Sequence, residues 1–143
     1  MDSESHQELE KQVEVIRMEL EDYLPKNTRL GLGMTREQDL AFLSLVREKL
    51  GPDFDLGELV FPGSWPVGTG CRLIIRHNPP TAIWFRYREA NEASEGRREY
   101  AWEDFCINIG WDPTSVPAIE ISSSDVHHEV KRRAIRKLKG HRK

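Results

Sequence analysis

The first apolar pattern along the chain is a seam within residues 5–24. Five apolar residues recur there at alternating spacings of four and three: Leu9, Val13, Ile16, Leu20 and Tyr23. This spacing predicts a helix that begins near Ser5 and ends before Pro25, and it is also the seam of a coiled coil. Two heptads leave two interpretations open: the helix packs on its own domain, or Leu9, Val13, Ile16 and Leu20 form a homodimer.

A broader apolar stripe predicts a second helix over residues 35–50. Thr35 and Gln38 have the spacing of a capping box, and Gly51 followed by Pro52 is a stop signal. Between these signals lie six apolar residues that predict a buried face: Leu40, Phe42, Leu43, Leu45, Val46 and Leu50. We therefore expect two helices before the first strand.

The middle of the chain carries the alternating and β-branched patterns that are typical of strands. Five segments are predicted to be extended: residues 58–61, 71–77, 81–88, 100–109 and 116–121. The connection at 91–96 is polar and is predicted to be a loop. Because sequential strands with short connections favour antiparallel pairing, we expect an antiparallel meander of about four strands in an α+β fold.

A cap over residues 122–125 predicts a last helix that extends to about Lys139. Its apolar residues step by four and form a stripe that can pack on the domain: Val126, Val130, Ala134 and Leu138. This pattern divides the chain into a single α+β domain over 1–121, which includes the acidic first helix, and a basic C-terminal helix or tail over 122–143.

The overall composition predicts an intracellular protein. The chain has 143 residues, a formal charge of −3 and two Cys residues, which are too few for a disulfide scaffold. It has no apolar run long enough to span a membrane, and the acidic residues 1–4 do not resemble a secretory signal. A cytoplasmic or nuclear location is expected.

The net charge conceals two oppositely charged ends. Residues 1–22 hold eight acidic and two basic residues, which gives −6, whereas residues 125–143 hold eight basic and two acidic residues, which gives +6. Such asymmetry predicts either a basic arm for a polyanion or two ends that neutralise each other.

The hairpin over 71–88 is predicted to pair Ile75 with Ile83 and His77 with Thr81, so that the apolar residues share one face. The opposite face then carries four arginines and a tryptophan: Arg72, Arg76, Trp84, Arg86 and Arg88. Guanidinium groups bind phosphate, and an indole ring stacks on bases, so this face predicts a nucleic-acid surface. In the alternative, carboxylates from a neighbouring strand or from the acidic first helix pair with these arginines.

The last helix is the second candidate surface. Five of its cations are predicted to contact phosphates: Lys131, Arg132, Arg133, Arg136 and Lys137. The segment 131–139 also matches the loose pattern of a nuclear-import signal. The alternative is a solvated basic helix without a ligand.

The sequence carries no motif for catalysis, and we expect a non-enzymatic protein without a metal or cofactor. Gly63 and Ser64 are not followed by the lysine of a phosphate-binding loop, and His127 and His128 are adjacent rather than one helical turn apart. Cys71 and Cys106 show no metal-binding spacing.

We therefore expect a small nucleic-acid-binding protein of regulatory or accessory type, including a viral one. RNA is preferred to DNA, because a basic sheet with an exposed tryptophan suits single strands and RNA shape. The alternative function is a protein-interaction adaptor or inhibitor that uses the loops around Trp65 and Trp111 as anchors.

Overall fold

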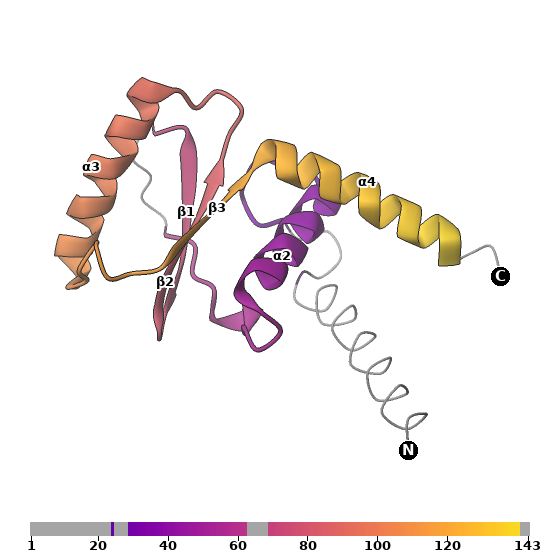
Figure 1. The fold of residues 1–143 in the computed structure, drawn as a ribbon, viewed down its shortest axis with the longest axis horizontal. Helices are drawn as coiled ribbons and strands as arrows, with labels where there is room; N and C mark the ends of the chain where they lie inside the picture. The colour runs from indigo at the N-terminus through magenta and orange to yellow at the C-terminus, as the bar shows by residue number, and fades with distance from the viewer. Residues whose placement is uncertain (1–23, 25–28, 63–68, 141–143) are drawn as a thin grey trace, which may run out of the picture.

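The computed structural model describes residue 24 and residues 29–62 and 69–140 (Figure 1). The predicted helix over 5–24 lies outside these residues except for Leu24, which is buried in the core. Both interpretations of its apolar seam, packing on its own domain and homodimerisation, therefore stay predictions.

Helix α2 (Arg36–Leu50) confirms the second predicted helix. The Thr35 hydroxyl accepts a hydrogen bond from the backbone N–H of Gln38, and the Gln38 side chain accepts one from the backbone N–H of Thr35 at 2.9 Å. Gly51 ends the helix with a positive φ of 94°, a conformation that glycine adopts without steric strain. The capping box and the stop signal thus act as the sequence predicts.

Three strands form one mixed sheet in the order β1-β2-β3. Strands β1 (Cys71–His77) and β2 (Pro80–Arg86) are antiparallel, whereas β3 (Ala118–Ser122) runs parallel to β2. The α+β class is confirmed, but the antiparallel meander of about four strands is wrong. The predicted strand at 58–61 is also wrong, because that segment makes only an isolated bridge from Val60 to Ile75 after a short 3₁₀ helix, η1 (Leu56–Glu58).

Helix α3 (Glu92–Ile109) replaces the predicted loop at 91–96 and the predicted strand at 100–109. Asn91 and Ser94 form a capping box, and Gly110 ends the helix in the left-handed region. Parallel strands need a long crossover connection, and α3 supplies it between β2 and β3. The aromatic and β-branched residues of 100–109 resemble a strand in composition, but the topology of the sheet requires a helix there.

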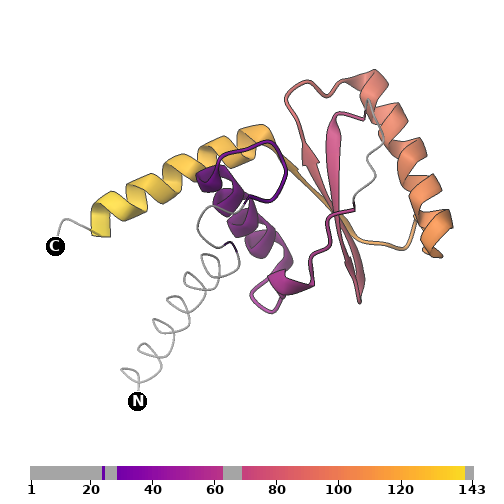
Figure 2. The ribbon, with the colours of Figure 1, turned by 180° about the vertical axis from the view of Figure 1, so that it is seen from behind.

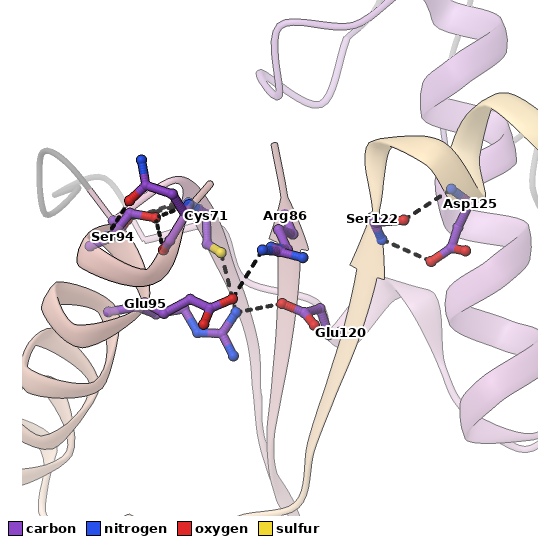
Figure 3. A network of polar contacts seen from close by, with 10 residues as sticks. Cys71, Arg86, Ser94, Glu95, Glu120, Ser122 and Asp125 are labelled. Carbon is purple, nitrogen blue, oxygen red and sulfur yellow. Dashed lines mark hydrogen bonds and ion pairs between the residues drawn. The ribbon is translucent and has the colours of Figure 1, made fainter. Parts of the chain in front are cut away.

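Helix α4 (Ser123–Gly140) confirms the last predicted helix. The Ser122 backbone N–H donates to the Asp125 carboxylate at 2.9 Å, and the Asp125 backbone N–H donates to the Ser122 hydroxyl at 3.1 Å (Figure 3). This reciprocal pair fixes the start of the helix directly at the end of β3.

The two faces of the sheet are covered by different helices. Helices α2 and α4 lie on one side and α3 on the other (Figures 1 and 2). The α2/α4 side holds an aliphatic core that includes Leu43, Ile74 and Ile121. The α3 side holds a smaller layer in which Trp84 packs against Trp102. The sheet is therefore a central layer without an open face.

Candidate nucleic-acid interface

The predicted hairpin pairs, Ile75 with Ile83 and His77 with Thr81, are wrong. His77 lies opposite Pro80, so the connection holds two residues in place of three, and every pair shifts by one position. The prediction assumed one apolar face and one solvent face. Because both faces are buried, the alternation of apolar residues could not select the register.

The observed register divides the predicted arginine surface. Directly opposite residues share a face of an antiparallel pair, and neighbouring residues along a strand alternate. Arg72 and Arg76 belong to the side covered by α2 and α4, whereas Trp84 and Arg86 belong to the side covered by α3. Arg88 lies beyond the end of β2 and is exposed. No face of the sheet brings the five residues together.

The two candidates on the α3 side are held by internal contacts. Arg86 forms an ion pair with Glu95 of α3 at 3.0 Å (Figure 3). Trp84 is buried, and its ring centroid lies 5.7 Å from that of Trp102 in an edge-to-face arrangement. A buried indole presents no free face, so the expectation of an exposed Trp84 is wrong.

The two candidates on the opposite side also have structural partners. Arg76 donates to the Thr81 hydroxyl at 3.3 Å, and its guanidinium lies 4.0 Å from the centroid of the Phe54 ring. Arg72 hydrogen-bonds Tyr87. Burial raises the pKa of Tyr87, while the charge of Arg72 acts in the opposite direction. Both arginines are therefore engaged in contacts within the fold.

Arg98 of α3 is the central polar residue between this helix and the sheet. It donates to Glu120 of β3 at 2.5 Å and to the sulfur of Cys71 at 3.2 Å, and its guanidinium lies 5.0 Å from the centroid of the Trp84 ring. Burial alone lowers the pKa of Arg98, but the hydrogen bonds to Cys71 and Glu120 outweigh it and raise the pKa. Arg98 therefore ties α3 to all three strands, since Cys71 is in β1 and Trp84 in β2.

Helix α4 keeps its cations at the surface. Lys131, Arg132 and Arg136 are exposed, and Arg133 is half-buried. The Lys137 side chain lies outside what the structure describes. Over Ser123–Gly140 the formal charge is +4, from six basic and two acidic residues. Of the two predicted surfaces, only α4 presents several cations together.

A buried glutamate partly neutralises the positive charge of the α4 surface. The Glu129 side chain is 3% exposed and forms ion pairs with Arg132, at 2.8 Å, and with Arg136. Both arginine side chains are more than half exposed, at 56% and 57%. Each keeps further N–H donors that face solvent, because a guanidinium carries five donors.

The predicted stripe of α4 packs on the domain only in its first half. Val126 is buried, and Val130 is half-buried against the same core. Ala134 and Leu138 are exposed, and Leu138 reaches 64%. The second half of α4 extends beyond the domain (Figure 1).

Comparison with protein-family models, with curated proteins and with solved structures found no match for this chain. Among the residues that the structure describes, no three His, Cys, Asp or Glu side chains are grouped to hold a metal ion. Within the same ranges, no helix combines the length and the hydropathy needed to cross a membrane.

Only one of the two predicted loop anchors lies within the described residues. Trp65 lies outside the described residues. Trp111 is half-buried, and its ring centroid lies 6.3 Å from that of Trp102 and 5.9 Å from that of His77. Trp111 therefore belongs to the aromatic layer under α3.

Sequence reasoning missed two features of the molecular surface. One is the acidic partner of the α4 arginines, although Glu129, Arg132 and Arg136 have the i, i+3 and i+7 spacing of one helix face. The other is the exposed outer stripe of α3, where Tyr100 and Ile107 are 76% and 74% exposed. Their seven-residue spacing was visible, but the segment was taken for a strand.

Proposed function

We propose that the protein is a non-enzymatic binder of nucleic acid that uses α4 to contact the phosphate backbone. The observation that carries the proposal is the cluster of cations on the half of α4 that extends beyond the domain. Lys131, Arg132 and Arg136 are exposed there within two helical turns. A dense row of cations repels itself in isolation, and a polyanion relieves that repulsion.

The proposal does not include the sheet arginines. Arg76 and Arg86 are engaged with Thr81 and Glu95, and Trp84 offers no stacking face. The preference for RNA over DNA relied on an exposed Trp84, and because Trp84 is buried this argument loses its basis. Contacts to phosphates carry no sequence information, so we expect binding to RNA and DNA with little sequence preference.

The test measures binding of the full chain to a labelled single-stranded RNA and a labelled duplex DNA at several salt concentrations. We expect affinity to fall steeply as salt rises, because phosphate contacts release counterions. Affinity that does not change with salt contradicts the proposal.

A matched pair of charge reversals locates the surface. Lys131→Glu removes an exposed cation of α4, and Arg88→Glu removes an exposed cation outside it. We expect Lys131→Glu to lower the salt slope by about one and to weaken binding, because one phosphate contact is lost. Arg88→Glu should leave both values unchanged, and an equal effect of the two variants argues against α4 as the site.

A second candidate function, protein interaction, is favoured by the outer stripe of α3. Tyr100 and Ile107 are large, exposed and seven residues apart, so they lie on one helix face. Exposed aromatic residues are enriched at interface hot spots. Under the first proposal, the double substitution Tyr100→Ser and Ile107→Ser leaves nucleic-acid binding unchanged. A loss of that binding would assign the surface to α3 instead.

A further inference from the structure

An open groove lies between α2 and α4. It has a volume of about 740 Å³, and its lining includes Arg47 and Glu48 of α2 and Glu129, Arg132, Ile135 and Arg136 of α4. Ile135 is 51% exposed. The groove therefore combines an apolar side chain with three guanidinium groups and two carboxylates, one of which, Glu129, already pairs with Arg132 and Arg136.

The apolar residues of α4 continue past the part that is packed. Val126 is buried and Val130 is half-buried, whereas Ile135 and Leu138 face solvent. An amphipathic helix normally buries such a stripe. The exposed half of the stripe, together with the groove, is thus a surface suited to a second amphipathic helix.

The chain itself holds a segment of the required chemistry. Residues 1–22 carry a formal charge of −6, and their apolar seam runs through Leu9, Val13, Ile16 and Leu20. Acidic residues flank this seam, including Glu10 and Glu14. Opposite charges beside an apolar seam set the choice of partner in helix pairs.

Leu24 follows this segment in the sequence and is the described residue nearest to it. Leu24 is buried in the core cluster that also contains Val126 of α4 and several residues of α2. Leu24 therefore belongs to the same core as α2 and the first half of α4.

We propose that the groove between α2 and α4 binds residues 1–22 of the same chain as an acidic amphipathic helix. The acidic side chains then lie beside Arg47, Arg132 and Arg136, and the seam covers Ile135 and Leu138. This inference is independent of nucleic-acid binding. If both hold, the acidic segment and nucleic acid compete for α4.

The test places a spin label at Gln12→Cys in the full chain and records the methyl signals by NMR. Cys71 and Cys106 are buried, and the wild-type chain treated with the same reagent controls for their labelling. We expect the signals of Ile135 and Leu138 to lose at least half of their intensity relative to the reduced label. Ile107 of α3 is exposed on the other side of the sheet and serves as the matched control, with no loss.

Two further samples make the outcome decisive. In a mixture of isotope-labelled chain without the spin label and unlabelled chain with it, signal loss at Ile135 assigns the groove to a second copy and overturns the proposal. Adding Leu9→Ser and Leu20→Ser to the spin-labelled chain should restore the signals. Unchanged Ile135 and Leu138 signals in the first sample, which contains no nucleic acid, also overturn it.

Discussion

The two sides of the sheet differ in what holds their helices. On the α2/α4 side, sixteen buried residues form one cluster that joins both helices to β1, β2 and β3. On the α3 side, the buried cluster has five residues, and its helical partners, Trp102 and Phe105, are only partly buried. Since burial of apolar area is the main stabilising term, the first side carries most of the stability of the fold.

The two sides also differ in how they use charge. The α3 cation Arg98 points inward to Glu120, and Glu95 of the same helix pairs with Arg86. On α4, the cations remain at the surface, and one buried acid, Glu129, holds two of them. Charge on α3 thus stabilises its packing on the sheet, whereas charge on α4 is available to a partner.

Neighbouring residues of β2 provide the largest test of this difference. Phe85 packs edge-to-face with Phe42 of α2, at 5.6 Å between centroids, and Trp84 lies under α3. Phe85→Ala should cost about 3–5 kcal/mol of the free energy of unfolding and destabilise the whole domain. Trp84→Ala should release α3 first. Urea unfolding measures the loss of unfolding free energy in each variant, and hydrogen exchange measures the protection of each helix. If Trp84→Ala lowers protection equally in α2 and α3, the proposed difference between the two sides of the sheet is contradicted.

The next test removes the hydrogen bonds by which Arg98 holds α3 to the sheet. Arg98→Met keeps an apolar stem but deletes the hydrogen bonds to Glu120 and Cys71. We expect a loss of about 1–2 kcal/mol of unfolding free energy, because hydrogen bonds of charged groups contribute on this scale. Chemical denaturation measures it. Arg88→Met, at an exposed arginine just beyond the end of β2, is the matched control and should cost less.

A smaller effect is expected at the start of α4. Asp125→Ala deletes a capping partner of Ser122 and should cost about 1 kcal/mol at neutral pH. The hydrogen bond from the Ser122 backbone lowers the pKa of Asp125 below its ordinary value of 3.8. Because the pKa of Asp125 is lower in the folded than in the unfolded chain, the ionised carboxylate stabilises the folded state at any pH above the unfolded pKa. This stabilisation is lost as the pH falls through the folded pKa. The difference between variant and wild type should therefore shrink below pH 3.8, and a constant difference would contradict this assignment.

The smallest effect concerns binding rather than folding. Glu129→Gln keeps the shape of the buried side chain but removes the charge that pairs with Arg132 and Arg136. If α4 contacts phosphates, the variant should bind nucleic acid several-fold more tightly and with a steeper salt slope. Fluorescence anisotropy of a labelled oligonucleotide measures this. Weaker binding by a folded variant would indicate that Glu129 positions the arginines.

Capping residues in the sequence predicted where two of the helices begin. The capping box of Thr35 and the reciprocal Ser122–Asp125 pair both form as expected, because each involves residues three apart. The α3 capping box at Asn91 has the same kind of signal, but the polar residues 91–96 were predicted to be a loop and 100–109 a strand. Local chemistry therefore fixes helix starts, whereas composition alone assigned the wrong structure to α3.

The surface was harder to predict than the elements. Of the five cations predicted on α4, Lys131, Arg132 and Arg136 are exposed and Arg133 is half-buried. The arginine face of the hairpin was predicted wrongly, because the register depends on the packing against both faces of the sheet. The sequence analysis did not identify α3 as a helix, and therefore did not predict that α3 covers Trp84. Long-range packing decided which side chains meet.

The most direct measurement of the central claim is an NMR titration of the full chain with a short oligonucleotide. The account predicts that the largest shifts fall on Lys131, Arg132 and Arg136 of α4, that they vanish at high salt, and that Tyr100 and Ile107 of α3 do not shift. Shifts confined to α3 or to the sheet would contradict the account, and so would an absence of binding at low salt.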